Sequence, residues 1–401
     1  MRVPEPPGHP GAISADAPVL LVTELFPPFK GGSAVLFDNV YSRLGQIPVT
    51  VVTDLAPGCP TDERRGRLRI LRQPVAMADW ALATPRGLAA YARATRSIRA
   101  AGVGRPALLH CGRALPEGLQ ALFATWPRTG RFLCWTHGEE LIYARSSREL
   151  TLLMRWVHRR AGAVVANSHH TAGMLKDLDV DPTKIHVVHP GVDAAHFHPD
   201  VDGSLVRSAL ASQDEVLLLT VGRLQRRKGH DLVLRALALL RDHRPRIRYA
   251  ILGKGEERGY LESIIQELSL QESVTFVIEK EGTDLSAYYA AADVFVMPNR
   301  VEAGDFEGFG IVFLEAAACG LPTIGGRTGG VPEAVEEERT GFLVGGESPQ
   351  ELADAIGRLA RSPELRHQMG RAGRARVREC FTWDRAAANI AALHRALTRA
   401  S

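Results

Sequence analysis

The sequence lacks the features that mark secreted, membrane-spanning and nucleic-acid-binding proteins. Its five cysteines are odd in number and scattered, without CxxC or zinc-ligand spacing, so neither a disulfide framework nor a zinc site is expected. A reduced, cytoplasmic protein with buried thiols is therefore expected. No apolar run approaches the roughly 18 residues needed to span a bilayer. Residues 1–17 have an arginine but no apolar stretch, which predicts a disordered tail instead of a signal peptide. The net charge of +4 is too weak to indicate a nucleic-acid partner.

What the sequence does contain is a regular alternation of short apolar runs with longer amphipathic segments. Such alternation is typical of an α/β fold, in which parallel strands are connected by crossover helices. The length of 401 residues exceeds what one hydrophobic core usually serves, so two domains are expected. The expected strands are 18–23, 49–53, 107–110, 132–135 and 163–166 in the first series, and 216–221, 248–252, 274–277, 294–297 and 322–324 in the second. We predict two doubly wound, Rossmann-like domains, 18–198 and 214–381, joined by a polar linker at 199–213.

Two glutamates bracket a glycine-rich turn in the segment Glu307-Gly-Phe-Gly-Ile-Val-Phe-Leu-Glu315. If the segment is largely helical, the two acids lie about 12 Å apart, roughly the length of a nucleoside-diphosphate sugar. One acid could then bind a sugar and the other a ribose, while Gly308 and Gly310 let helix N-terminal amides approach a diphosphate. The alternative is that both acids are ordinary surface residues. Against it, Glu315 lies in an apolar helix, where an unpaired carboxylate is costly.

Arg223 and Lys228 follow the expected strand that ends at Val221. Ligands of α/β sheets bind beyond the carboxyl ends of the strands. A guanidinium fork and an ammonium group suit a leaving diphosphate, on which negative charge grows as the glycosidic bond breaks. The alternative is a solvated basic loop, and we interpret the neighbouring Arg226 and Arg227 in that way.

These segments resemble the signatures of the retaining family-4 glycosyltransferases of GT-B fold, which have a Glu-x7-Glu motif and an Arg-x4-Lys pair. The resemblance covers nearly the whole chain, and the order of the segments makes it specific although each is weak alone. The other matching segments are Phe26-Pro-Pro-Phe-Lys-Gly-Gly32, His137-Gly-Glu139, Val165-Ala-Asn-Ser168, His189-Pro-Gly-Val-Asp193, Asp293-Val-Phe-Val-Met-Pro298, Gly329-Gly-Val-Pro-Glu333 and Thr340-Gly-Phe-Leu-Val344.

The resemblance implies a role for several of these residues. Glu307 is expected to bind the donor-sugar hydroxyls and Glu315 the ribose hydroxyls, while Arg223 and Lys228 are expected to bind the diphosphate. His137 is expected beside the donor sugar, although a structural histidine is the alternative. The residues expected to contact the donor also include Gly31, Gly32, Gly308, Phe309, Gly310 and Ile311, although Gly31 and Gly32 could instead form an ordinary turn.

The implied architecture has two domains facing across a cleft, with the helix in residues 382–401 crossing back to the first, acceptor-side domain. The implied reaction is transfer of a hexose from GDP-mannose or a UDP-hexose to a hydroxyl of a glycan or glycolipid, with retention and without a cofactor. A nucleotide-sugar epimerase or hydrolase and a non-catalytic nucleotide-sugar-binding partner are the alternatives. The choice between guanosine and uridine stays open, because many members have a glycine soon after the strand at 274–277, whereas this chain has none before Gly282.

Asp305 and Glu307 could also be read as a metal-binding pair bridging an ion to a diphosphate. We predict metal independence instead, because Arg223, Lys228 and the helix N-terminus already offer positive charge. A donor nucleotide sugar and a glycan or lipid-linked acceptor are thus the expected partners.

Arginines are concentrated in the first domain, with nine between residues 64 and 99 against a single acid, Asp79. Two basic helix stripes are expected, formed by Arg86, Arg93 and Arg96 and by Arg148, Arg155 and Arg159. Such stripes are usually solvated faces. Next to apolar side chains they also suit anionic lipid head groups, so peripheral association with the inner face of the plasma membrane is a hypothesis.

Overall fold

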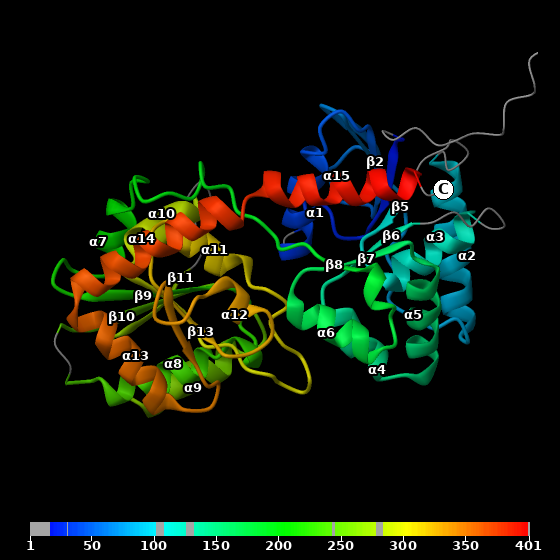
Figure 1. Ribbon diagram of the computed structural model, residues 1–401. Coiled ribbons are helices and arrows are strands. Elements are labelled where there is room, and N and C mark those ends of the chain that lie inside the picture. Colours follow the sequence, from blue (N-terminus) through cyan, green and yellow to red (C-terminus); the bar gives the residue numbers. More distant parts are fainter. Residues whose placement is uncertain are drawn as a thin grey trace, which may run out of the picture. The chain divides into compact units, whose positions relative to one another are not determined.

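The computed structural model describes residues 17–29, 31–101, 108–125, 132–242, 245–277 and 284–399. The chain divides into two compact units. Unit 1 comprises Met1–Ala166, Met174–Val188 and Ala387–Ser401, and unit 2 comprises Asn167–Gly173 and His189–Ala386. Each unit is an α/β structure with its own sheet (Figure 1).

Unit 1 contains an eight-stranded sheet in the order β3-β4-β2-β1-β5-β6-β7-β8. Every neighbouring pair is parallel except β3 and β4, which form an antiparallel edge. The strands are β1 (Val19–Val22), β2 (Val49–Thr53), β3 (Asp62–Arg65), β4 (Leu68–Arg72), β5 (Leu108–Cys111), β6 (Leu133–Thr136), β7 (Ala163–Ala166) and β8 (Ile185–Val187). The central strands are buried along their whole length because helices cover both faces of a parallel sheet.

The helices connecting these strands begin at recognisable signals. α2 has Thr84 as N-cap and proline at its first position, and α5 has Ser147 as N-cap. The helices are α1 (Gly32–Ser42), α2 (Pro85–Ala100), the π-helical turn η1 (Ala114–Gly118), α3 (Leu119–Thr125), α4 (Glu139–Arg145), α5 (Arg148–Arg160), α6 (His169–Asp177) and the short turn η2 (Pro182–Lys184).

Unit 2 contains a six-stranded parallel sheet in the order β11-β10-β9-β12-β13-β14. Its strands are β9 (Val216–Val221), β10 (Ile247–Leu252), β11 (Val274–Val277), β12 (Val294–Met297), β13 (Thr323–Gly326) and β14 (Gly341–Val344). Its helices are α7 (Ser204–Leu210), the short turn η3 (Arg226–Lys228), α8 (His230–Leu239), α9 (Arg258–Glu267), α10 (Leu285–Ala291), α11 (Ile311–Ala318), α12 (Val331–Ala334), α13 (Pro349–Arg361) and α14 (Pro363–Cys380).

Alternate residues of β9 face the two hydrophobic cores of unit 2. Leu218 packs in the core with α8, α9 and α13, whereas Leu217 and Leu219 pack in the core with α10 and α11. Figure 1 shows these two groups of helices on opposite faces of the sheet. Successive side chains of a strand point to opposite faces, so a doubly covered sheet needs a continuously apolar strand.

The last helix, α15 (Trp383–Arg399), begins in unit 2 and continues in unit 1 from Ala387 onward. In unit 1 the ring of His394 lies 3.3 Å from the ring nitrogen of His110 and 2.9 Å from the carbonyl oxygen of Ala17. The predicted return of the C-terminal helix to the first domain is thus confirmed. Within the described residues, no helix has the length and apolarity to cross a bilayer.

Several boundaries differ from the expected ones. The segment predicted as a linker, 199–213, carries α7 and lies within unit 2, whose long segment begins already at His189. Of the predicted tail, 1–16 lies outside the described residues, and so do 278–283, where the chain departs from the family pattern. All ten predicted strands are present, but the sequence reasoning missed four: β3, β4, β8 and β14.

Candidate active site

Two loops of unit 2 bring Lys228 and Glu307 into contact. Lys228 ends the turn η3 after β9, and Glu307 lies just before α11. The Lys228 ammonium donates a hydrogen bond to Glu307 Oε2, and Arg227 Nη1 lies 3.0 Å from the same oxygen. Both basic side chains are buried. The structure therefore joins two of the predicted catalytic residues in one buried ion-pair cluster.

The cations around Glu307 keep it ionised. Burial alone would raise the pKa of Glu307, but the charges of Lys228 and Arg227, and their hydrogen bonds, outweigh burial and lower the pKa. A buried carboxylate needs such partners, since its charge is otherwise costly. Glu307 can consequently accept hydrogen bonds from sugar hydroxyls while it fixes the position of the lysine.

Close backbone packing holds the turn before α11. Gly310 has φ of 88°, and a Cβ atom there would lie 2.7 Å from the ring of Phe313. The Gly330 amide donates to the Glu307 carbonyl at 2.9 Å, and a Cβ atom on Gly330 would lie 2.2 Å from the Gly308 carbonyl oxygen. The Gly329-Gly-Val-Pro-Glu333 segment thus packs directly on the turn, and larger residues would separate the two.

The other predicted donor contacts in unit 2 lie as follows. The Arg223 side chain is exposed, and its carbonyl oxygen is 3.3 Å from the buried ring of His230. Glu315 accepts a hydrogen bond of 2.7 Å from the Tyr289 hydroxyl, and burial raises the pKa of Glu315. Phe309 is buried, so its side chain packs in the core. Only its backbone can contact a nucleotide-sugar donor. Ile311 is partly exposed at the first position of α11.

The interpretation of Arg227 as a solvated charge was wrong, whereas the side chain of Arg226 is 40% exposed. Arg227 is 5% exposed and its Nε lies 2.9 Å from Asp305 Oδ2, while its other end reaches Glu307. Arg226 lies 2.5 Å from Glu257 and stacks on Tyr260 with its guanidinium carbon 3.5 Å from the ring centroid. The signal that could have identified Arg227 is the spacing of the acids Asp305 and Glu307, since two nearby carboxylates need more than one cation.

In unit 1, His137 is a buried, neutral histidine. Its Nε2 lies 3.1 Å from the Gly112 carbonyl oxygen, and its ring stacks parallel to that of Trp135. Burial and the charge of Arg113 lower the pKa of His137 to about 4. Gly31, the N-cap of α1, has φ of 152° and open space around its Cβ position, and Gly32 is the first residue of that helix.

Glu140 has features that the sequence alone did not reveal. One carboxylate oxygen accepts a 2.8 Å hydrogen bond from the His137 amide, and the other is buried and lacks a side-chain hydrogen-bond partner among the described residues. Burial raises the pKa of Glu140 to about 7. A carboxyl group that titrates near neutral pH beside His137 is typical of functional sites.

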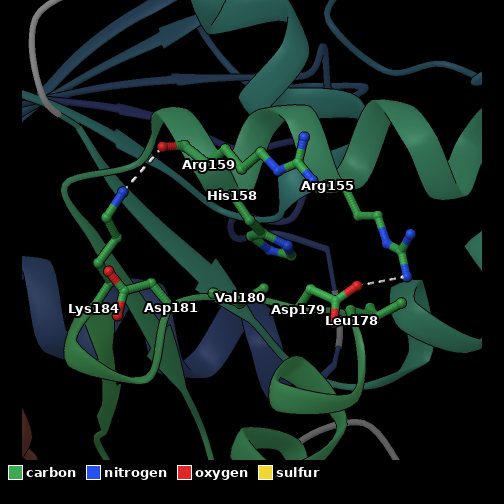
Figure 2. Close-up of a pocket in the computed structure, with 8 residues that line it drawn as sticks. All are labelled: Arg155, His158, Arg159, Leu178, Asp179, Val180, Asp181 and Lys184. Atoms are coloured by element: carbon green, nitrogen blue, oxygen red, sulfur yellow. Dashed lines mark hydrogen bonds and ion pairs between the residues drawn. The ribbon is translucent and has the colours of Figure 1, made fainter.

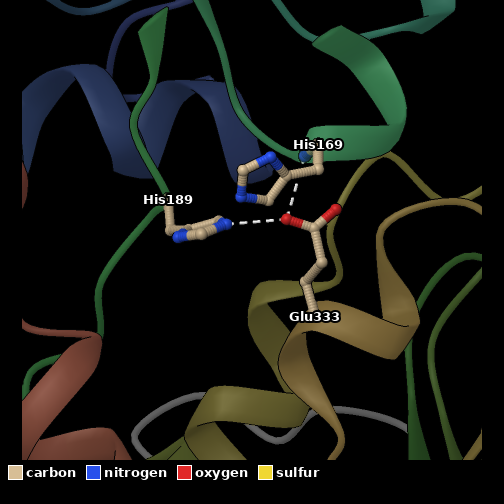
Figure 3. A group of neighbouring side chains, drawn as sticks. All are labelled: His169, His189 and Glu333. Atoms are coloured by element: carbon tan, nitrogen blue, oxygen red, sulfur yellow. Dashed lines mark hydrogen bonds and ion pairs between the residues drawn. The ribbon is translucent and has the colours of Figure 1, made fainter. Parts of the chain in front are cut away.

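One group of side chains has the chemistry of a metal site. His169, His189 and Glu333 can each offer a ligand atom, and these atoms lie within 4.8 Å of one another (Figure 3). Glu333 is already engaged, because Oε2 lies 2.7 Å from His189 Nε2 and the carboxylate accepts hydrogen bonds from the amides of His169 and His170. It therefore acts here as an acceptor for the first turn of α6.

Unit 1 contains a cavity of its own (Figure 2). It is lined by Arg155, His158, Arg159, Leu178, Asp179, Val180, Asp181 and Lys184. These residues come from the segments just before β7 and β8, at the amino ends of the strands. Ligands of α/β sheets bind at the opposite edge.

The architecture is that of the GT-B glycosyltransferases. The structure of sucrose-phosphate synthase from Thermosynechococcus elongatus matches with a TM-score of 0.80 and 25% identity, covering 96% of this chain and 100% of that one. The sequence profile described as Glycosyltransferase Family 4 matches residues 31–196, and Glycosyl transferases group 1 matches residues 204–376.

The chain belongs to the family-4 glycosyltransferases. It is 31% identical to the GDP-mannose-dependent alpha-(1-6)-phosphatidylinositol monomannoside mannosyltransferase of Mycolicibacterium smegmatis, over 94% of this chain and 97% of that protein. A second relative, the D-inositol 3-phosphate glycosyltransferase of Streptomyces scabiei, is 36% identical over 59% of this chain and 54% of its own length. The protein is therefore a glycosyltransferase, as predicted.

Proposed function

We propose that the enzyme transfers mannose from GDP-mannose to a hydroxyl of a glycolipid, with retention of the anomeric configuration. The observation that carries the proposal is the buried contact of Lys228 and Arg227 with Glu307, directly before a glycine turn and helix. The relative from M. smegmatis, matched over almost its whole length, supports GDP-mannose and a lipid-linked acceptor as substrates.

The basic side chains would stabilise the leaving diphosphate. As the bond between the sugar C1 and the diphosphate oxygen breaks, negative charge grows on that oxygen, and Lys228 and Arg223 can compensate it. The amides at the start of α11 add to this positive field. The acceptor oxygen bonds to C1 from the same face, and its proton passes to the departing diphosphate. Glu307 would hold the sugar hydroxyls and orient the lysine.

Acceptor-dependent release of GDP tests this function. Purified enzyme is incubated with GDP-mannose, with and without a lipid extract that contains both neutral glycolipids and phosphatidylinositol mannosides, and GDP and each mannosylated lipid are quantified. We expect GDP release that requires the extract and equals the product formed. Release of GDP without an acceptor would favour a hydrolase, and conversion of GDP-mannose to another nucleotide sugar would favour an epimerase. Binding without turnover would favour a non-catalytic partner. Transfer from UDP-glucose but not GDP-mannose would overturn the donor assignment.

We also propose that unit 1 contacts an anionic membrane surface. Arg86, Arg93 and Arg96 are exposed on α2, and Leu88 on the same helix is 55% exposed. The stripe on α5 is weaker support, because Arg155 lies 3.1 Å from Asp179. At low salt, exposed arginines beside an exposed apolar side chain attract anionic lipid.

Sedimentation with vesicles of phosphatidylglycerol and phosphatidylcholine measures this contact. The Arg86→Gln, Arg93→Gln and Arg96→Gln triple variant should sediment less than the wild type. A matched triple change of Arg339, Arg358 and Arg361 in unit 2 should have no effect. Absence of wild-type sedimentation at low salt would exclude the membrane contact.

A further inference from the structure

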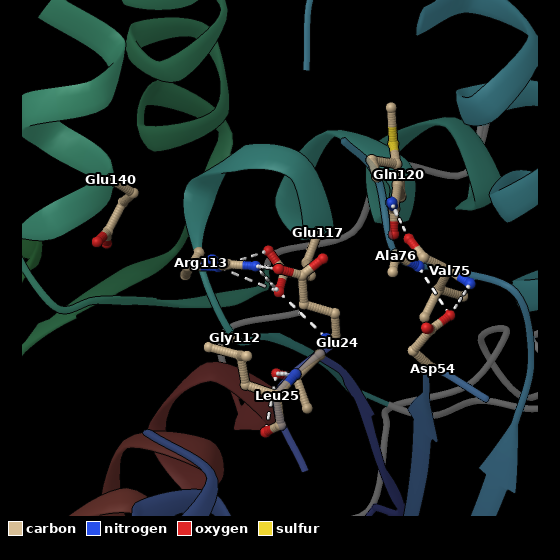
Figure 4. Close-up of polar contacts among 12 residues, drawn as sticks. Glu24, Leu25, Asp54, Val75, Ala76, Gly112, Arg113, Glu117, Gln120 and Glu140 are labelled. Atoms are coloured by element: carbon tan, nitrogen blue, oxygen red, sulfur yellow. Dashed lines mark hydrogen bonds and ion pairs between the residues drawn. The ribbon is translucent and has the colours of Figure 1, made fainter. Parts of the chain in front are cut away.

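A second charged cluster lies at the carboxyl edge of the unit 1 sheet, and no function above uses it (Figure 4). Arg113 follows β5, Glu24 follows β1, and Glu117 lies in η1. The Arg113 guanidinium donates hydrogen bonds to the carboxylates of both Glu24 and Glu117. We call these three residues the acidic cluster.

The acidic cluster has an excess of negative charge, since two carboxylates share one guanidinium. The side chain of Glu117 is 1% exposed and that of Arg113 13%, whereas that of Glu24 is 18% exposed. Burial, and then the charge of Glu117, raise the pKa of Glu24. Because its side chain is the most exposed of the three, Glu24 is the member of the acidic cluster that a ligand can reach most easily.

An aromatic pair lies next to the acidic cluster. The Arg113 guanidinium carbon is 5.3 Å from the centroid of the Trp80 ring, and the Tyr143 ring meets the Trp80 ring edge-on at 4.6 Å. Trp80 is fixed, because its Nε1 donates to the Met77 carbonyl and its carbonyl accepts from the Tyr91 hydroxyl. Tyr143 is 48% exposed, so part of the pair faces solvent.

Apolar side chains lie on the neighbouring loops of the same edge. Phe29 follows β1 and is 38% exposed, and Leu55 follows β2 and is 48% exposed. Large apolar side chains exposed on loops of one edge suggest contact with an apolar ligand or surface.

We propose that the acidic cluster and the Trp80–Tyr143 pair form an acceptor subsite for a neutral, hydroxyl-bearing ring linked to an apolar group, and not for a phosphorylated ring. Carboxylates accept and the guanidinium donates, so ring hydroxyls of either orientation find partners. The aromatic faces suit the apolar C–H face of such a ring. A phosphate would meet a site in which carboxylates outnumber the guanidinium, so it would be repelled. This inference rests on the proposed function, whose acceptor it specifies.

Acceptor preference and acceptor affinity test the inference. The probes are octyl α-D-mannopyranoside, methyl α-D-mannopyranoside and D-inositol 3-phosphate, with GDP-mannose as donor. We expect the lowest KM for the octyl mannoside and the highest for the inositol phosphate. Glu24→Gln should raise the octyl mannoside KM by about tenfold, the effect of one charge-assisted hydrogen bond, and leave the GDP-mannose KM within about twofold.

Two further variants separate ligand binding from a structural role. Trp80→Ala should weaken acceptor binding more than Trp80→Phe, which keeps an aromatic face. Asp62→Asn, an exposed acid on the edge strand β3, should behave as the wild type. A lower KM for inositol 3-phosphate than for octyl mannoside, or an unchanged acceptor KM in Glu24→Gln, would overturn the inference.

Ligand-observed NMR keeps this test separate from the proposed function. Saturation transfer from the protein to octyl mannoside should be strong in the wild type and reduced in Glu24→Gln, whether or not sugar is transferred. Failure of transfer with intact, Glu24-dependent binding counts against the proposed function alone. Absence of octyl mannoside binding counts against the subsite.

Discussion

The carboxyl edges of the two sheets carry opposite balances of charge. In unit 2 the cluster at this edge joins Lys228 and Arg227 to Glu307 and Asp305. Two further basic residues lie at the same edge, Arg223 after β9 and Lys254 after β10. In unit 1 the acidic cluster has two carboxylates for one arginine. Similar α/β frameworks thus carry a more cationic set of loops in unit 2 and a more acidic set in unit 1. Under the proposed function, the first would bind the diphosphate and the second the acceptor hydroxyls. The loops after the strands, and not the sheets, carry this difference.

The largest expected effect comes from removing the lysine of the cationic edge. Lys228→Ala should lower kcat by about 100- to 1,000-fold, because one fixed charge that stabilises the leaving group is lost. Steady-state kinetics with GDP-mannose and acceptor measure it, and circular dichroism checks folding. Arg226→Ala, on the same turn but bound to Glu257 and Tyr260, is the control.

The contact with Glu307 makes the lysine prediction sharper. Glu307→Gln should also lower kcat, and the double variant should lose less than the product of the two single losses, because residues in contact act as a unit. Near-wild-type rates for both single variants would remove the basis for calling this edge catalytic.

Buried carboxyls in the two units should differ in their response to pH. The pKa of Glu307 is lowered by its cations, whereas burial raises the pKa of Glu140 from 4.5 to about 7. The folded protein therefore binds the Glu140 proton more tightly than the unfolded chain does. The protonated Glu140 carboxyl therefore contributes about 3 kcal/mol to the free energy of unfolding at pH 4.5. This contribution is lost as the pH rises to about 7.

Glu140→Gln should abolish this pH dependence. The free energy of unfolding of the variant minus that of the wild type should be more positive at pH 8 than at pH 5. Urea unfolding at both pH values measures this difference. Glu139→Gln, at the exposed neighbouring position, is the control and should show the same difference at both pH values. A pH-independent difference for Glu140→Gln would mean that this carboxyl is ionised throughout and would weaken the contrast between the units.

Sequence reasoning found the cationic edge more readily than the acidic one. Lys228 follows a strand and Glu307 precedes a glycine turn, so local patterns identify both. The acidic cluster joins Arg113 to a glutamate 89 residues away, and only the order of the strands brings β1 beside β5. Such long-range pairs have no signal in a single sequence.

The missed strands and misread arginines have a related cause. The strand β3 (Asp62–Arg65) consists entirely of charged residues, so it lacks the apolar pattern of a strand. Its hairpin with β4 explains part of the arginine-rich segment, because Arg69 pairs with Asp62, and Arg72 lies 2.9 Å from Glu63. The count of arginines between residues 64 and 99 therefore overestimated the number of unpaired basic side chains. The acids that pair with two of them, Asp62 and Glu63, lie just before that segment.

A smaller effect is expected at Glu333, a carboxylate of unit 2 that is paired with helix amides and a histidine. Glu333→Ala should lower the free energy of unfolding by about 1 to 2 kcal/mol, because the first amides of α6 lose their acceptor. Glu333→Gln keeps an amide oxygen and should lose less. Urea unfolding measures both. Equal losses would show that charge, and not helix capping, is the contribution of this residue.

The smallest expected effect is that of chelation. Asp305 Oδ2 lies 2.9 Å from Arg227, and Glu307 contacts both Arg227 and Lys228, so each carboxylate of the possible metal pair is already neutralised. A divalent ion would have to displace these cations before it could bridge the pair to a diphosphate. The transfer rate in excess EDTA should therefore stay within about twofold of the rate with Mg²⁺, because fixed side-chain charge already compensates the leaving group. Loss of activity in EDTA with recovery on adding Mg²⁺ or Mn²⁺ would show that the ion pairs open during catalysis. The carboxylates of unit 2 would then bind metal, and the charge contrast between the two edges would hold only for the free enzyme.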